Sequence, residues 1–255
     1  MALEQYVRKK LREKDILLMT HTVLGYPSLE DSFRIIETMV KSGVDLMELQ
    51  IPFPEPIADG PVIRHANQAA LQQGVCVKDC LDVAEQAARS FDIPFLFMTY
   101  YNIPFCFGVS QFVCAMAQRG LVGAIIPDLP VEDGHDYLQA MRDHGLSPIR
   151  MFSPTTSDSR MKKISSSARG FIYCVARKGI TGADTIFSHD VALYLKRCRR
   201  ASGLPLAVGF GIKDRDHVEF LKGKADIAVI GSQTIRVAEE MGVASLGEFI
   251  RRLRL

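Results

Sequence analysis

The most constraining feature of this sequence is a regular alternation, repeated eight times, of a short apolar run with a longer helical pattern. Runs of about four to eight apolar, β-branched or aromatic residues indicate strands. Because the runs are apolar on both faces and are joined by helices, they favour a parallel sheet covered on both sides. The predicted strands are Ile16–Val23, Val44–Ile51, Pro94–Tyr101, Gly123–Pro127, Ser147–Phe152, Gly170–Ala176, Pro205–Phe210 and Ala225–Ile230.

Eight such units close into a barrel more naturally than they form an open sheet, and 255 residues is a usual length for one barrel. No linker rich in Pro, Gly or Ser interrupts the series, so residues 1–255 are predicted to form a single (β/α)8 TIM-barrel domain. An extra helix is expected at the N-terminus, around Leu3–Leu11, and a short extra helix after strand eight. The other predicted helices are Leu29–Ser42, Lys78–Ser90, Gln111–Arg119, Gly134–His144, Asp158–Ser167, Ser188–Ala201, Asp214–Lys222, Gln233–Glu240 and Ser245–Arg254.

Residues suited to helix ends support these boundaries. Serine favours the N-cap position, and glycine favours the left-handed position just after a helix. The predicted caps are Ser28, Ser110 and Ser188 at N-termini, and Gly43, Gly120 and Gly145 at C-termini.

Composition excludes several classes of protein. The chain has 31 basic and 29 acidic side chains, a balance that gives no reason to expect a nucleic-acid or membrane surface. Six loosely spaced cysteines in a chain of this length indicate free thiols rather than a disulfide scaffold, and they complete no zinc set. The N-terminus lacks the apolar region of a secretory signal, so a cytoplasmic location is expected.

The second predicted strand carries the leading candidate for chemistry. Side chains alternate along a strand, so Glu48 shares a face with Leu46 and Gln50 and points into the barrel near its upper rim. Strand two offers no basic partner for this carboxylate, which favours a general acid or base over a structural ion pair. Asp59 follows in a proline-stiffened loop. Its Asp-Gly-Pro sequence suits a plain turn equally well, but with Glu48 it would place two carboxylates on one rim.

Glycine-rich strand ends indicate a phosphorylated substrate. The seventh strand ends in Val208–Ile212, and the eighth runs through Gly231 and Ser232 directly into the short extra helix. Barrels often bind phosphate at this place, where glycines expose N–H groups and a helix N-terminus adds unpaired donors. Strand six leads into a further loop, Arg177–Ala183, which is suited to closing over such a site. The glycines form no dinucleotide fingerprint, so no nicotinamide cofactor is expected.

The histidines form no cluster. Five of them, at positions 65, 135, 144, 189 and 217, fall in helices or loops and are expected on the surface. His21 is the exception, because the end of strand one would let it face the pocket. No Ser-His-Asp or Cys-His arrangement and no metal site can be argued from the sequence.

Over essentially its whole length the chain resembles the tryptophan synthase α-subunit family. The segments that carry this resemblance are Leu24–Pro27, Glu48–Leu49, Pro52–Phe53, Pro56–Pro61, Met98–Asn102, Pro127–Glu132, Gly179–Gly182 and Gly209–Ile212. The resemblance implies a lyase that cleaves indole-3-glycerol phosphate to indole and glyceraldehyde 3-phosphate by a retro-aldol reaction, with no metal or organic cofactor in this chain. It also implies a β subunit that carries pyridoxal phosphate, in an αββα assembly.

The resemblance also implies roles for individual residues. Glu48 would be the general acid and base, and Asp59 would accept a hydrogen bond from the indole N–H. The substrate would also contact Tyr173 and Tyr100, and its phosphate would contact Gly182, Gly211, Gly231 and Ser232.

Some positions depart from the pattern usual in this family. Gln50 replaces a glycine, Pro54 and Glu55 replace Ser-Asp, Arg64 replaces a glutamine, and His21 replaces an aromatic residue. Because Gln50 shares the inward face with Glu48, we expect it to crowd the pocket or hydrogen-bond that carboxylate. The changed loop leaves an alternative function open, a catalytically weakened subunit that mainly activates a β subunit. A weaker alternative is another phosphate-binding barrel, such as an epimerase or isomerase.

Overall fold

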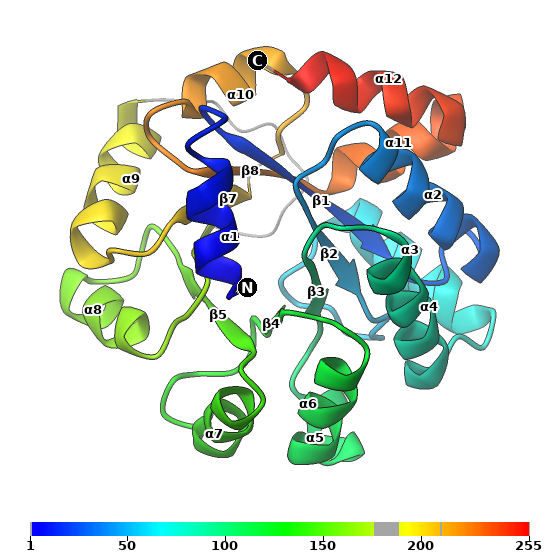
Figure 1. Cartoon of the computed structure of the whole chain (residues 1–255), viewed down its shortest axis with the longest axis horizontal. Coiled ribbons are helices and arrows are strands. Elements are labelled where there is room, and N and C mark those ends of the chain that lie inside the picture. The colour runs from blue at the N-terminus through cyan, green and yellow to red at the C-terminus, as the bar shows by residue number, and fades with distance from the viewer. Residues whose placement is uncertain (1, 176–188, 210, 255) are drawn as a thin grey trace.

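Eight parallel strands, β1 to β8, pair in sequence order, and β8 returns to pair with β1, so the described part of the chain forms a closed barrel (Figure 1). The structure is a computed structural model and describes residues 2–175, 189–209 and 211–254. The predicted TIM-barrel fold is confirmed. The strands are β1 Leu17–Val23, β2 Leu46–Gln50, β3 Phe95–Met98, β4 Gly123–Ile125, β5 Ser147–Phe152, β6 Ile172–Val175, β7 Leu206–Gly209 and β8 Ile227–Ile230.

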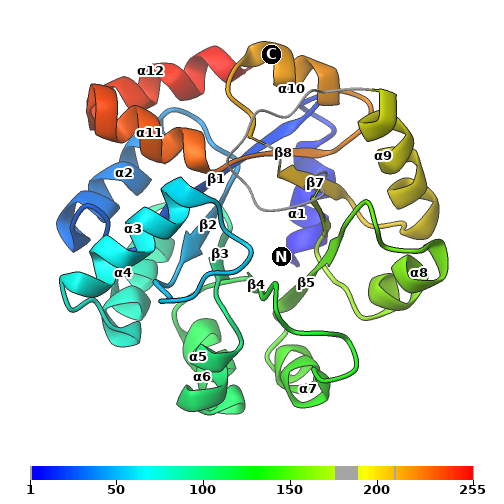
Figure 2. The ribbon, with the colours of Figure 1, turned by 180° about the vertical axis from the view of Figure 1, so that it is seen from behind.

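The helices form a ring around this barrel, seen from both ends in Figures 1 and 2. No helix in the described ranges is long and apolar enough to cross a bilayer. The helices are α1 Leu3–Lys10, α2 Leu29–Lys41, α3 Pro61–Gln72, α4 Val77–Ser90, α5 Asn102–Phe107, α6 Val109–Gln118, α7 His135–Asp143, α8 Asp158–Ser166, α9 His189–Ala201, α10 Arg215–Leu221, α11 Ser232–Met241 and α12 Val243–Leu253.

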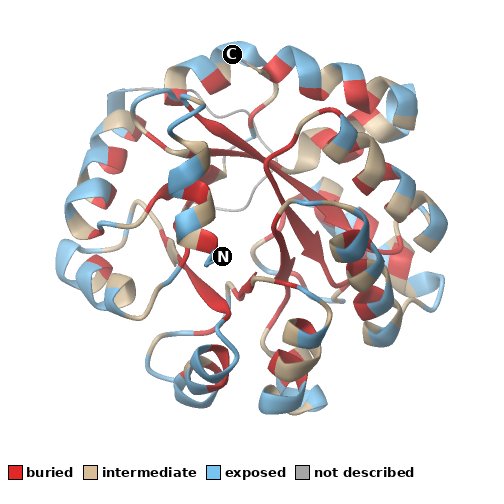
Figure 3. Cartoon of the chain, viewed as in Figure 1, coloured by how far each residue is buried: buried red, intermediate tan, exposed pale blue. Residues whose placement is uncertain are grey.

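Two apolar cores explain why this sequence closes into a barrel. One core lies between the barrel and the helices, and it takes the outward residues of the strands, such as Met47 and Leu49. The other lies inside the barrel, where α1 covers the N-terminal end and packs Leu3 and Val7 against inward residues such as Leu46. Burying each of these side chains of α1 contributes roughly 1.5–3 kcal/mol. Burial therefore follows the strands and the inner faces of the helices (Figure 3).

Most of the predicted helix caps are confirmed. The hydroxyl of Ser28 accepts the Asp31 N–H at 3.0 Å, and the three C-terminal glycines adopt φ values of 95°, 79° and 66°. The N-cap prediction for Ser110 was wrong, because α6 begins two residues earlier than predicted, at Val109, and its N-cap is Gly108 with φ 90°. Ser188 lies outside the described residues.

Two helices lie where none was assigned. α3 occupies much of the long stretch after β2. This helix begins with Pro61, and proline is favoured at the first position of a helix. The second is α5, which has only six residues and contains Pro104, so its sequence gives little periodic signal.

Candidate active site

The C-terminal ends of β1 and β2 place His21 beside Glu48. The two residues are register partners on adjacent strands, and both are almost completely buried. His21 Nδ1 lies 3.1 Å from Glu48 Oε1. In the described part of the chain, Glu48 Oε2 and His21 Nε2 are buried without a hydrogen-bond partner. Glu48 therefore points inward as its alternation predicts, but it has a partner, which comes from the neighbouring strand.

Asp59 lies in the loop after β2 and is held by two hydrogen bonds. Its Oδ2 accepts one from Gln50 Nε2 at 2.7 Å and one from the Tyr100 hydroxyl at 3.0 Å. The Ala58 N–H in turn donates to the Tyr100 oxygen at 3.0 Å. The expected hydrogen bond from Gln50 to Glu48 is therefore wrong, since the amide donates to Asp59. The loop folds back over the end of β2, so the Gln50 amide reaches Asp59 instead.

Two further residues fix the loop that carries Asp59. The Phe53 ring stacks on Tyr100 with ring centroids 4.9 Å apart. Buried Asn67 on α3 accepts the Phe53 N–H at 2.8 Å and donates to the Ile63 carbonyl oxygen at 2.8 Å. Neither contact was predicted, because the Asn67 bonds depend on α3, which was not assigned, and the stack joins the segments that follow β2 and β3.

Burial and the neighbouring charges shift pKa values in this cluster. Burial by itself lowers the pKa of His21, but the hydrogen bond and charge of Glu48, with the charge of Asp59, outweigh it and raise that pKa above 6.5. Burial raises the pKa of Asp59 above 3.8, and the charge of His21 and the two hydrogen bonds oppose that rise. The three groups therefore share one electrostatic environment.

Tyr173 on β6 completes the inward cluster. Burial, followed by the charges of Glu48 and Asp59, raises the pKa of its hydroxyl well above 10. The Tyr173 hydroxyl lies over Gly209 of β7, where a Cβ atom would come within 2.4 Å of it. Glycine at this position therefore leaves the space that the tyrosine occupies.

The residues expected to hold phosphate lie partly within the described chain. Gly231 and Ser232 begin α11, and Gly231 lies against His21, since a Cβ added there would be 3.8 Å from the His21 Cβ. The Thr234 hydroxyl lies 3.0 Å from the His21 carbonyl oxygen and thereby connects this helix to β1. Gly211 has a positive φ of 59°. Gly182 lies outside the described residues.

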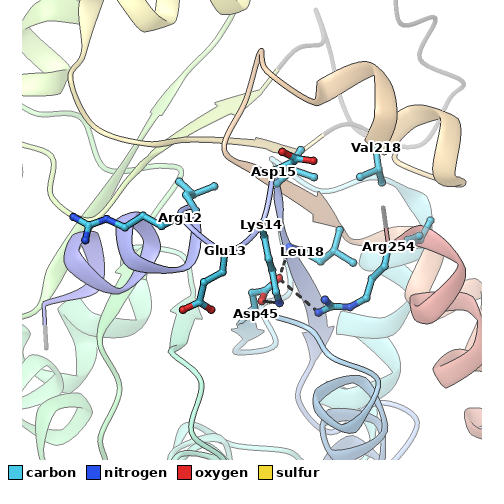
Figure 4. Close-up of a pocket in the computed structure, with 11 residues that line it drawn as sticks. Arg12, Glu13, Lys14, Asp15, Leu18, Asp45, Val218 and Arg254 are labelled. Carbon is cyan, nitrogen blue, oxygen red and sulfur yellow. Dashed lines mark hydrogen bonds and ion pairs between the residues drawn. The ribbon is translucent and has the colours of Figure 1, made fainter.

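A separate cavity of about 280 Å³ lies at the opposite, N-terminal ends of β1 and β2 (Figure 4). Asp45 in its wall is buried and contacts Lys14 and Arg254. Because active sites of such barrels lie at the C-terminal ends of the strands, this cavity does not belong to the Glu48 site. Among the described residues, no group of three or more His, Cys, Asp or Glu side chains is arranged to hold a metal ion.

Comparisons with known proteins agree with the resemblance found in the sequence. The family model described as tryptophan synthase alpha chain matches residues 7–250. The tryptophan synthase alpha chain of Desulforapulum autotrophicum is 61% identical over 251 residues, covering 98% of this chain and 99% of that protein. That of Syntrophotalea carbinolica is 59% identical over 252 residues, covering 99% and 100%.

Solved structures give the same result. A structure of Mycobacterium tuberculosis tryptophan synthase matches with a TM-score of 0.93 and 29% identity, covering 100% of this chain and 99% of that chain. Since both the family model and the relatives cover nearly all of the sequence, the chain belongs to the tryptophan synthase alpha chain family.

Proposed function

We propose that Glu48 is the general acid and base of the lyase reaction and that Asp59 stabilises its cationic intermediate. The reaction of this family is the retro-aldol cleavage of indole-3-glycerol phosphate in tryptophan biosynthesis. The observation that carries the assignment is the pair of buried carboxylates at one end of the barrel. One has an oxygen with no hydrogen-bond partner among the residues that the structure describes, and the other is held in place by Gln50 and Tyr100.

The chemistry requires one proton to arrive at the indole ring and one to leave the glycerol side chain. Glu48 gives a proton to indole C3, which makes the ring a cation, and Asp59 accepts a hydrogen bond from the indole N–H of that cation. Glu48 then takes the proton of the hydroxyl on the carbon attached to C3. As the carbon–carbon bond breaks, its electron pair returns to the indole ring and the hydroxyl carbon becomes the aldehyde.

The substrate-binding residues follow from the same arrangement. We assign the indole to the space beside Tyr173 and Tyr100. We assign the phosphate to Gly182, Gly211, Gly231 and Ser232, where the start of α11 supplies backbone N–H groups and the positive end of a helix dipole. Side chains alone perform the proton transfers, so we assign no cofactor to this chain.

Membership of this family also indicates a partner subunit. A structure of the tryptophan synthase complex of Pyrococcus furiosus matches this chain with a TM-score of 0.86 and 27% identity, covering 94% of this chain and 98% of that chain. We propose that the chain binds a β subunit carrying pyridoxal phosphate in an αββα heterotetramer, and that this assembly works in the cytoplasm.

The test is release of indole from indole-3-glycerol phosphate by the full chain, with and without a β subunit. We expect Glu48→Gln to lower kcat by about 10²- to 10⁴-fold, the usual contribution of acid–base catalysis. Glu37→Gln is the control, since that partly exposed glutamate on α2 pairs only with Lys41 in the described structure. Wild-type turnover in Glu48→Gln contradicts the assignment. A wild-type chain that cleaves no substrate but raises β-subunit turnover supports the activator function instead.

A further inference from the structure

The roles assigned to Glu48 and Asp59 leave His21 without a function. It is a buried imidazole, 2% exposed, on the strand next to Glu48. Its Nδ1 binds only one of the two carboxylate oxygens, at 3.1 Å, and its Nε2 is buried without a hydrogen-bond partner among the described residues. An unpaired buried nitrogen costs stability, so packing alone does not account for an imidazole at this place.

The main chain fixes where the imidazole lies. Register pairing between β1 and β2 sets His21 opposite Glu48. On the other side, Gly231 approaches the His21 Cβ, and the Thr234 hydroxyl lies against the His21 carbonyl oxygen. The contact between His21 and Glu48 is therefore built into the barrel and does not depend on a surface loop.

The carboxylates around His21 favour its protonated form. Glu48 and Asp59 both favour the charged imidazole. The Tyr100 hydroxyl donates to Asp59, and the charges of Glu48 and Asp59 both act on the Tyr173 hydroxyl. His21 also lines a mainly apolar cavity of about 310 Å³ that contains Tyr26 and Glu239, which are hydrogen-bonded to each other. Within the described chain, no Lys or Arg forms an ion pair or a hydrogen bond with Glu48 or Asp59.

We propose that His21 is a positioning residue that holds Glu48 through Oε1, leaves Oε2 for the substrate, and shares with Glu48 the proton that the reaction uses. The proposal rests on the proposed acid–base function of Glu48. The pair gives one proton to indole C3 through Oε2 and regains one from the glycerol hydroxyl, so its proton count is unchanged after a turnover. After C3 is protonated, the Nδ1–H donor stabilises the carboxylate that remains.

Two substitutions separate orientation from proton sharing. His21→Asn keeps an N–H donor near the position of Nδ1 but cannot titrate, whereas His21→Phe fills the space with neither property. The measurement is kcat and KM for indole release by the full chain from about pH 5 to about pH 9. His144→Asn is the matched control, because His144 is exposed at the end of α7.

The pair holds its last proton to higher pH than a lone carboxyl group does, because a titrating imidazole belongs to it. We therefore expect the alkaline limb of kcat to move down by about one pH unit or more in both variants. The maximum kcat should fall about tenfold or more in His21→Phe and stay within about threefold of the wild type in His21→Asn, with KM changed less than kcat.

Profiles of the variants that superimpose on the wild type, or that fall in height with an unmoved alkaline limb, overturn the proposal. The second result would leave His21 a merely structural role. If His21→Phe does not fold, the alkaline limb of kcat in His21→Asn is sufficient to test the proposal. Failure of the proposed function is distinguishable, because it requires Glu48→Gln to keep wild-type turnover. The His21 proposal alone fails if Glu48→Gln is inactive while the alkaline limb of the His21 variants stays in place.

Discussion

Two buried carboxylates, one just before β2 and one in the strand, differ in how their oxygens are used. Asp45 precedes the strand and Glu48 lies within it, and each is 3% exposed. Asp45 has a partner for both oxygens: Oδ1 accepts from Lys14, while Oδ2 accepts the Leu18 N–H at 3.0 Å and lies 3.7 Å from Arg254 Nη2 (Figure 4). Within the described ranges, Glu48 has one bond to His21 and one unpaired oxygen.

This difference separates the contacts that hold the chain ends to the barrel from the residues proposed for catalysis. Lys14 follows α1 and Arg254 follows α12, so Asp45 ties both ends of the described chain to the base of β1 and β2. Among the described residues, Glu48 forms no ion pair with a Lys or Arg, and we propose that its unpaired oxygen binds the substrate. Buried ion pairs are costly to break from one side, whereas an unpaired polar group is retained at the expense of stability.

The largest effect on stability is expected from Asp45→Ala. The substitution removes the acceptor of the Leu18 N–H and leaves Lys14 and Arg254 without their carboxylate. Because both cations are about one-third exposed and can hydrate, we expect the free energy of unfolding to fall by about 3 kcal/mol, the lower end for breaking a buried pair. Urea titration followed by circular dichroism measures this change.

The matched variant is Glu48→Gln, which should change the free energy of unfolding by less than about 1 kcal/mol. Below the unfolding transition, kcat of Asp45→Ala should equal that of the wild type. If Asp45→Ala loses activity without losing stability, or Glu48→Gln unfolds the chain, the proposed separation between the two ends is wrong.

The sequence predicted the direction of the Glu48 side chain better than the contacts that this side chain makes. Alternation along a strand is local, so it was enough to turn Glu48 inward and to pack Met47 and Leu49 outward. The contact with His21 depends on the register between β1 and β2, which the alternation within each strand does not set. The sequence therefore indicated that His21 could face the pocket but not which atom it would bind.

The course of the chain after β2 was also beyond the local pattern. Gln50 was expected to act on Glu48, because both share the inward face of the strand. Its actual partner, Asp59, is brought back by a loop whose shape depends on Asn67 of α3 and on the Phe53–Tyr100 stack. These are tertiary contacts, and single-residue preferences carry no signal for them.

A smaller effect is expected from Gln50→Gly, which removes one of the two hydrogen bonds that hold Asp59. The Gln50 bond lowers the pKa of Asp59, so its loss should raise that pKa further. If the charged form of Asp59 stabilises the indole cation, the acidic limb of kcat/KM for indole release should move to higher pH.

Tyr100→Phe is the matched variant for this prediction, because it removes the other hydrogen bond to the same oxygen. It should move the acidic limb in the same direction. Hydrogen bonds to charged groups contribute about 1.5–3 kcal/mol, which sets the upper size of either shift. An acidic limb that stays in place in both variants would show that Asp59 does not act as a carboxylate in catalysis.

The smallest effect concerns how the stability of the two ends depends on pH. The pKa of His21 in the folded chain is raised above 6.5, so the folded state binds this proton more tightly than the unfolded state. The resulting stabilisation is fully present below pH 6.5 and is lost as pH rises through the folded pKa. The pKa of Asp59 is raised above 3.8, so the stabilisation from its proton is likewise lost as pH rises, but starting from about pH 3.8.

Urea titrations of the wild type and His21→Asn across this range measure the contribution of His21, because every other titrating group is common to both chains. The wild-type advantage in the free energy of unfolding should be largest below about pH 6.5 and shrink as pH rises. The same comparison with Lys14→Gln, at the Asp45 end, should give a difference that does not vary with pH over this window, because that contact among the described residues includes no imidazole. If the difference between wild type and His21→Asn is also constant, His21 carries no extra proton in the folded chain, and the contrast with the Asp45 cluster disappears.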